Sequence, residues 1–313
     1  MRRLTDFITQ ASWEDIIVHL FVIVDDAYQA LAPILPCQRR RGPQPRFSDS
    51  EVITVSLIID FWFGGNEELG LAFLRQYHLD LFPHLPSPSR FNERRRRLGL
   101  VMESIRRYLL AAFHLLPDDD PWRLVDSLPA PVCQYSHAPR CQTVTGSEYV
   151  GRVASKKSKF FGFRLQMTTT LDQVVDVWLL TPAAHKDAKM LAPLLESCQD
   201  VVLLADNAYH DPGEAHFLAQ SRGIRIHALP RRDSRHPWHP EFRRLVRRLR
   251  LRIETAFSIL TTTFHIQRLG ARSLSGVITR IASRLLAYTL CFILAPLFLT
   301  GELQPATGAK TPN

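Results

Sequence analysis

Hydrophobic residues in the first 116 positions recur at the 3.6-residue spacing of amphipathic helices. The clearest run is Trp13–Leu31, where the apolar residues form one stripe. Ser48 and Glu51 have the S-x-x-E spacing of a capping box, which predicts a helix beginning near Asp49. Together the periodic segments predict helices at 13–31, 49–63, 67–78 and 89–116. Their succession is typical of a helix-turn-helix-like module, so we expect an all-α domain at residues 1–116.

A different pattern follows the acidic, proline-containing segment Pro117–Pro121. Short runs rich in β-branched and apolar residues alternate there with helical patterns. They predict strands at 123–127, 162–170, 174–180, 201–205 and 224–229, and helices at 186–197, 212–222 and 241–264. This order resembles an RNase H-like α/β fold, a mixed sheet flanked by helices. We expect this domain at 122–300 and a disordered tail at 301–313.

Composition and charge narrow the class of protein. The chain has 313 residues, which suggests two structural units, and 46% of them are hydrophobic, which argues against a disordered or collagen-like protein. Lys and Arg number 39 against 30 Asp and Glu, and most of the excess is arginine. Arginine favours planar anions such as phosphate, so an anionic partner is expected.

Neither of the two apolar runs has the features of a membrane anchor. The run at 16–24 contains His19 and continues into acidic residues without a cleavage site for a signal peptide. The run at 285–299 is interrupted by Pro296 and is shorter than the roughly 20 residues that cross a bilayer. Both predict buried helices and no membrane partner. The five cysteines form no CxxC pair, which suits a reducing, cytoplasmic location.

Basic residues cluster in two predicted surface segments. The helix at 89–116 begins with the run SRFNERRRRLG, and two lysines lie in the loop before the strand at 162–170. A solvated charged surface and a set of contacts to DNA phosphates are both consistent with such clusters. The candidate DNA-binding residues in these segments are Arg94, Arg95, Arg96, Arg97, Lys156 and Lys157.

Three acidic residues are candidates for chemistry. Asp126 ends the segment RLVDS, Asp206 ends the buried segment VVLLAD, and Glu254 lies beside the apolar stripe of the helix at 241–264. Ligand sites in open α/β sheets lie at the carboxyl ends of strands, so adjacent strands can bring the two aspartates together. Three converging carboxylates can hold two divalent cations about 3.5–4 Å apart for in-line phosphoryl transfer.

Each carboxylate also has an ordinary structural interpretation. An aspartate at a strand end often closes a turn, and Asp206 can bond the backbone that follows it. Glu254 can pair with Arg250 four residues earlier, an interaction worth about 0.2–0.5 kcal/mol. Arg247 and Arg250 share roughly one helix face with Glu254, so both are candidates to anchor a DNA strand.

Two further groups of residues have weaker patterns. The even spacing of Cys133, His137 and Cys141 suggests zinc, but a fourth ligand at motif spacing is missing, so a loop or core role is the better interpretation. His185 and Asp187 follow the predicted strand at 174–180, where a turn or helix cap explains them.

These residues occur within blocks that resemble the DDE transposases of bacterial insertion sequences, most closely the insertion sequence 982 family. The blocks are VDSLPAPVC, ASKKSKFFGFRLQ, LTPAAHKDA, LLADNAY and RIETAFSIL, together with ELGLAFLRQY and FPHLPSPSRFNERRRRL in the helical region. They occur in the family's order and cover nearly the whole chain.

The resemblance implies a DNA transposase with Asp126, Asp206 and Glu254 as catalytic and metal-binding residues. It implies two Mg²⁺ ions, which Mn²⁺ can replace, an N-terminal domain that binds element ends, and DNA partners in the form of terminal repeats and target DNA. It further implies a homo-oligomer in the synaptic complex and an association with the bacterial nucleoid.

The chain departs from the family pattern at several positions. Relatives commonly have Lys and then a small residue after the second Asp, where this chain has Asn207 and Ala208. In the wider Y-x2-R-x3-E-x6-K signature, Arg247 occupies the Tyr position and Thr261 the Lys position. Two other functions therefore stay open: a non-catalytic DNA-binding protein or decayed transposase, and an RNase H-like nuclease that cuts without joining strands.

Overall fold

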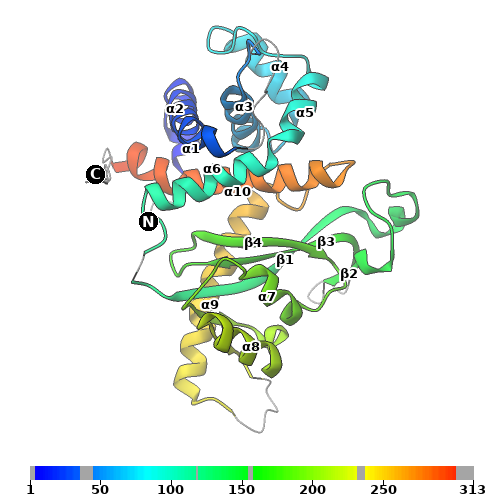
Figure 1. Cartoon of the computed structure of the whole chain (residues 1–313). Coiled ribbons are helices and arrows are strands. Elements are labelled where there is room, and N and C mark those ends of the chain that lie inside the picture. The colour runs from blue at the N-terminus through cyan, green and yellow to red at the C-terminus, as the bar shows by residue number, and fades with distance from the viewer. Residues whose placement is uncertain (1–3, 36–44, 118, 154–157, 231–236, 301–313) are drawn as a thin grey trace. The chain divides into compact units, whose positions relative to one another are not determined.

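The computed structural model describes residues 4–35, 45–117, 119–153, 158–230 and 237–300 (Figure 1). Packing divides the chain into two compact units. The helical unit comprises the described residues of Met1–Leu115, Thr263–Ile266 and Ser275–Asn313. The sheet unit comprises those of Leu116–Thr262 and Gln267–Leu274. In the sequence, the sheet unit is therefore inserted into the helical unit.

Most helices of the helical unit lie where the hydrophobic pattern predicts them. They are α1 (Phe7–Gln10), α2 (Trp13–Leu31), α3 (Asp49–Trp62), α4 (Glu67–Tyr77), α5 (Pro88–Arg97), α6 (Gly99–Ala112) and α10 (Leu274–Thr300), with a 3₁₀ turn at Ala32–Ile34. Ser48 and Glu51 form the predicted capping box, each side chain bonding the other residue's backbone amide. The polar cap therefore defines where α3 begins.

The prediction of a single helix at 89–116 is wrong, because the chain breaks at Leu98 into α5 and α6. The Leu98 amide donates to the Arg95 carbonyl three residues back, which tightens the end of α5. Gly99 follows and lies against α10, where an added Cβ atom would be 3.1 Å from the Thr279 Cα atom. The break thus allows α10 to approach closely, and the close approach favours glycine.

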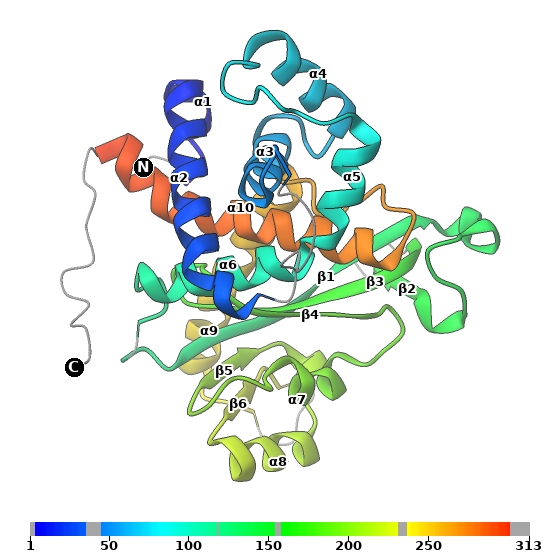
Figure 2. The same ribbon diagram turned by 45° about the horizontal axis from the view of Figure 1, so that its top comes forward.

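Helix α10 is a core element of the helical unit (Figure 2). Two segments, Trp13–Ile34 and Leu274–Leu299, are long and apolar enough to cross a membrane by length and composition alone. In the second, 78% of the most apolar window is buried inside the protein, against 28% in the first. The ring of Phe298 stacks on that of Phe7 at 6.0 Å between centroids. The prediction of a buried helix at 285–299 is confirmed.

The two units divide the chain differently from the predicted domains. The sequence places 122–300 in one domain, whereas α10 packs with the N-terminal helices and belongs to their unit. The strongly apolar surface of α10 explains this grouping, because it is buried against helices of the same character. The functional domain boundaries stay a prediction, and the predicted tail at 301–313 lies outside the described residues.

The sheet unit contains a mixed six-stranded sheet. Its strands are β1 (Trp122–Gln134), β2 (Val150–Val153), β3 (Ser158–Thr169), β4 (Val175–Pro182), β5 (Val202–Ala205) and β6 (Arg225–Ala228), in the order β2-β3-β1-β5-β6 with β4 also paired to β3. β1, β5 and β6 run parallel, and the other pairs are antiparallel. The predicted fold class, an RNase H-like mixed sheet flanked by helices and preceded in sequence by a helical region, is confirmed.

Strand β1 is much longer than the predicted segment at 123–127, so Asp126 lies inside a strand and not at its end. Pro129 and Pro131 interrupt the sequence pattern because proline cannot donate to a ladder. Beyond Leu124, however, β1 pairs along β3 and no longer along β5, and its register shifts between Pro131 and Cys133. Prolines are tolerated at such an edge and near a bulge.

Other elements of the sheet unit differ from prediction in detail. Strand β2 has only four residues and was not predicted. The helix predicted at 186–197 is a 3₁₀ turn, Asp187–Met190, followed by one turn of helix, α7 (Leu191–Leu194). Pro193 lacks the amide hydrogen that a longer helix needs and crowds the carbonyl four residues back. Helix α8 (Pro212–Arg222) ends at Gly223, as predicted.

Helices cover both faces of this sheet (Figure 1). On one face, Leu124 and Leu204 pack against Val246 and Ile253 of α9 (Pro240–Thr262). On the other face, residues such as Val125 pack against α7, α8 and the turn after β5. Because side chains alternate along a strand, the residue two positions after Leu124 projects toward the α9 face.

Candidate active site

Asp126 and Asp206 lie just beyond the parallel pairing of two adjacent strands. The β1–β5 register pairs Leu124 with Leu204, and each aspartate follows two positions later. The pairing ends at Leu124 and Leu204, and the charge of Asp206 acts on Asp126, so the two carboxylates lie close to each other just beyond it. Neighbouring strands are about 4.8 Å apart, which allows two carboxylates to interact directly. The pairing of these strands is as predicted.

The environment of Asp126 disfavours its negative charge. The pKa of Asp126 is raised to about 6, chiefly by burial and in smaller part by the charges of Asp206 and Asp187. The Ser127 amide, which donates to Asp126 Oδ1 at 2.8 Å, and the guanidinium of Arg250 lower the pKa. A carboxylate kept ionised in such a place needs a positive partner.

Asp206 has a structural role as well as its place beside Asp126. Its Oδ1 atom accepts a hydrogen bond of 2.8 Å from the Ala208 amide and caps the 3₁₀ turn Asn207–Tyr209. This is the local backbone contact that the sequence allows. The turn holds the aspartate directly after β5, at the carboxyl end of that strand.

Helix α9 brings Arg250 to the aspartates. Arg250 Nη2 lies 3.1 Å from Asp126 Oδ2, with the Asp126 side chain 22% exposed. Glu254 follows one turn later and is exposed, while its neighbour Ile253 packs against the sheet. The ordinary interpretation of Arg250 as the partner of Glu254 is therefore replaced by a contact to Asp126.

The donor chemistry at this edge fits hard divalent cations, because Asp126 and Asp206 offer carboxylate oxygens. Within the described ranges, no three acidic, histidine or cysteine side chains converge at ligand spacing. Glu254 thus does not complete a three-carboxylate cluster in this arrangement. The positive partner of Asp126 is the guanidinium of Arg250.

A third carboxylate, Asp187, also acts on this edge, and sequence reasoning assigned it only a cap or turn. Its charge raises the pKa of Asp126, and it accepts a 2.6 Å hydrogen bond from Gln166 Nε2. Tyr209 donates to Gln166 Oε1 at 2.6 Å. The LTPAAHKDA block is the signal that marks this segment, although periodicity does not relate Asp187 to the two aspartates.

The predicted DNA-binding residues are distributed unevenly over surface and interior. Arg96 and Arg97 are exposed, and Arg97 pairs with Glu93 at 2.6 Å. Arg94 is half-buried and pairs with Asp49 at 2.5 Å. On α9, Arg247 is exposed, and so are Arg244 and Arg248, for which no contact with DNA was predicted. Lys156 and Lys157 lie outside the described residues.

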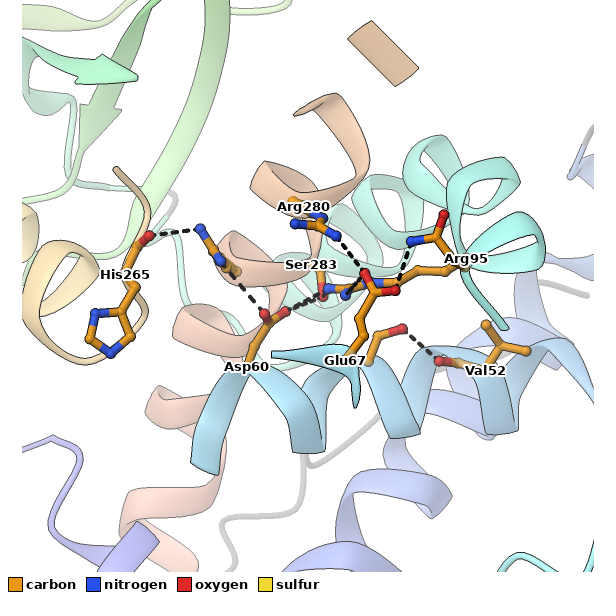
Figure 3. Close-up of polar contacts among 10 residues, drawn as sticks. Val52, Asp60, Glu67, Arg95, His265, Arg280 and Ser283 are labelled. Carbon is orange, nitrogen blue, oxygen red and sulfur yellow. Dashed lines mark hydrogen bonds and ion pairs between the residues drawn. The ribbon is translucent and has the colours of Figure 1, made fainter. Parts of the chain in front are cut away.

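Arg95 is buried, contrary to the surface role expected for it. Its side chain is 2% exposed, and its guanidinium pairs with Asp60 at 3.2 Å and with Glu67 at 3.1 Å. Figure 3 shows these groups together with Ser283 and Arg280 of α10, which pairs with Glu67 at 2.7 Å. Helical spacing places one residue of an RRRR run on the inner face, so Arg95 joins a buried ion-pair network and is unavailable to DNA in this structure.

The cysteines at the end of β1 and after it do not form a zinc site with a histidine. The thiols of Cys133 and Cys141 hydrogen-bond each other, and burial raises the pKa of Cys133 to about 11. Among the residues described, no third ligand joins them at metal-binding spacing.

The sequence was compared with known protein families, curated proteins and solved structures. The model of the family described as Transposase DDE domain matches residues 117–290, more than half of the chain. Neither the curated proteins nor the solved structures yielded a match.

Proposed function

The chain belongs to the DDE transposases, a family whose domain is a catalytic nuclease and transferase, and from this premise we propose its reaction. Water attacks a phosphodiester at the end of a mobile element, and the released 3′-hydroxyl then attacks target DNA. The observation that carries this proposal is the pair Asp126, in β1, and Asp206, directly after the adjacent parallel strand β5, whose charges interact within the matched domain.

Asp126, Asp206 and Glu254 are the proposed metal-binding residues. Two Mg²⁺ ions, or Mn²⁺ in their place, would activate the attacking oxygen and stabilise the leaving oxygen. Asp126 and Asp206 provide donors whose positions the strands and the 3₁₀ turn fix before any ligand binds. Glu254, which is exposed in this structure, would join them from α9 when the cations bind, and α9 already contacts Asp126 through Arg250.

Arg250 has two successive partners in this proposal. Without a cation, its guanidinium neutralises Asp126 at 3.1 Å. A divalent cation bound at Asp126 would supply this positive charge, and the planar donors of Arg250 would then suit an oxygen of the scissile phosphate. This change of partner explains why Arg250 pairs with Asp126, although Asp126 is proposed to bind a cation during the reaction.

DNA binding follows from the family and agrees with the net charge of +9. We assign phosphate contacts to the exposed Arg96 and Arg97 in the helical unit and to Arg247 on α9. Terminal repeats and target DNA are the proposed partners, and a homo-oligomer is the proposed active form.

The finer family assignment and location are also proposals. The ordered blocks from VDSLPAPVC to RIETAFSIL support membership of the insertion sequence 982 family. Such a protein would act in the bacterial cytoplasm, at the nucleoid. The burial of α10 inside the helical unit supports an aqueous location.

Cleavage of labelled element-end DNA by the purified protein in Mg²⁺ or Mn²⁺ tests the triad. We expect Asp126→Ala, Asp206→Ala and Glu254→Ala to abolish cleavage while DNA binding persists. Asp172→Ala is the matched control, because Asp172 lies in the β3–β4 turn with its side chain 86% exposed. Cleavage at the wild-type rate by any of the three triad variants would contradict the assignment.

The same assay separates the alternatives. A non-catalytic DNA-binding protein binds with strong salt dependence and never nicks the strand. A nuclease of this fold cuts but leaves no product joined to target DNA. A joined product that depends on the divalent cation and on Asp126 supports transposition.

A further inference from the structure

Three side chains from separate segments of the sheet unit form a chain of hydrogen bonds, and two of the three are buried. The Tyr209 hydroxyl donates to Gln166 Oε1 at 2.6 Å, and Gln166 Nε2 donates to Asp187 Oδ1 at 2.6 Å. Tyr209 is 1% exposed and Gln166 is fully buried. Short hydrogen bonds in such a place are stronger than in water and costly to break.

The chain has a single direction. Both ends of the Gln166 amide are used, the oxygen as acceptor and the nitrogen as donor, so the amide cannot turn over without losing both bonds. An ionised Asp187 can only accept, and it therefore ends the chain. Each member thus fixes the orientation of the next.

The chain contacts the segments on which the two proposed catalytic aspartates lie. Gln166 of β3 pairs with Ser127 of β1, the residue after Asp126. Tyr209 ends the turn that Asp206 caps, and it also hydrogen-bonds the Ser127 side chain. Asp187 begins the segment after β4. The Gln166 side chain therefore connects β3 both to the turn after β5, through Tyr209, and to the turn after β4, through Asp187. Tyr209 also connects the first of these turns to β1 through Ser127.

We propose that Gln166 and Tyr209 are positioning residues, which hold Asp206 and Asp187 beside Asp126 and thereby set the affinity of this edge for divalent cations. The inference rests on the proposed function of Asp126 and Asp206. Neither positioning residue contacts DNA or the reacting atoms in it. Their effect passes through the turn at Asn207–Tyr209 and through the Asp187 carboxylate.

Packing alone is the competing explanation, because Tyr209 also belongs to the core beneath α7 and α8. A packing residue affects the unfolding temperature. A positioning residue affects cation binding at a temperature where the protein is fully folded. Tyr209→Phe separates the two, since it keeps the ring in the core and removes only the hydroxyl donor.

Titration of Mn²⁺ into the full-length protein without DNA, followed by calorimetry, is the direct test. We expect Tyr209→Phe to bind Mn²⁺ about tenfold more weakly or worse, the range found when an outer partner of a ligand is lost. Gln166→Met, similar in size but without either hydrogen bond, should lose at least as much. Tyr288→Phe, a buried tyrosine in α10, is the matched control and should bind Mn²⁺ normally.

Cleavage assays complete the test. DNA affinity should stay unchanged in both positioning variants, and raised Mn²⁺ should restore their cleavage rate. Wild-type Mn²⁺ affinity in both folded variants would overturn the inference. Asp206→Asn is measured in parallel. If Asp206→Asn binds Mn²⁺ and cleaves DNA normally, the proposed function is wrong. If Asp206→Asn is inactive while Tyr209→Phe and Gln166→Met behave as the wild type, only the positioning role is wrong.

Discussion

Replacing Asp126 with asparagine should make the metal-free protein more stable at neutral pH while it abolishes cleavage. The ionised carboxylate is largely removed from water and is repelled by Asp206 and Asp187, so its charge lowers the free energy of unfolding. An amide of the same shape carries no charge. Its oxygen can still accept from the Ser127 amide, but the amide NH₂ group takes the place of Oδ2 and cannot accept from Arg250, so the loss of that contact offsets part of the gain.

The magnitude follows from the pKa of Asp126, which rises from 3.8 to about 6 in the fold. Each pKa unit corresponds to about 1.4 kcal/mol, so the ionised group costs about 3 kcal/mol at pH 7. This value already includes the attraction of Arg250, which opposes the rise. Between pH 4 and 6 the native protein holds a proton that the unfolded chain has released. The free energy of unfolding therefore falls as pH rises through this window.

Urea denaturation at several pH values measures the effect. Asp126→Asn should gain about 1–2 kcal/mol at pH 7, because the lost contact to Arg250 offsets part of the gain, and it should lose the pH slope between 4 and 6. Asp172→Asn, at an exposed carboxylate, should change the free energy of unfolding by less than about 0.5 kcal/mol. A variant at Asp126 that is no more stable than the wild type at pH 7, with the same slope, would refute the reasoning.

Three further predictions concern stability and assembly of the fold. Asp60→Asn removes a fully buried charge and should lower the free energy of unfolding, measured by urea denaturation, by about 3–5 kcal/mol. Arg97→Ala, at an exposed pair, should lower it by less than about 1 kcal/mol. Equal losses in the two variants would contradict a stabilising role of the buried ion pairs. Gly162→Ala should lower the melting temperature measured by circular dichroism, because φ is 149° and the added Cβ would lie 2.7 Å from a β1 carbonyl oxygen; an unchanged melting curve would count against this. A fragment of residues 1–116 should show little helical circular dichroism alone, because its helices pack against α10, and should gain it when a peptide of residues 274–300 is added. Cooperative unfolding of the fragment by itself would show that it does not depend on α10.

Local patterns in the sequence predict much of this fold. The ends of α2 and α8 were predictable because a stripe of apolar residues, a polar cap and a terminal glycine are all local signals. The break at Leu98 was not, because it depends on contact with α10, which lies far along the chain. The length of β1 was not predictable, because its two prolines indicate a break in the strand. They are accommodated because this part of β1 pairs with β3 and no longer with β5.

The candidate site shows the same division. Asp126 and Asp206 could be selected because each follows or lies in a strand that the pattern predicts, and the family blocks contain both. The pairing of Asp126 with Arg250 and the place of Asp187 depend on side-chain geometry between separate elements. The burial of Arg95 depends on which face of a short helix meets Asp60. No local pattern contains that information.

The inserted arrangement of the chain has a consequence during synthesis. A ribosome makes Asp60, Glu67 and Arg95 early, but their partners Arg280 and Ser283 emerge only after the whole sheet unit has been translated. The nascent N-terminal helices therefore expose apolar surface until α10 has been synthesised and packs against them. A premature stop codon anywhere before residue 280 would therefore leave the helical unit without α10 and its buried ion pairs without their last partners.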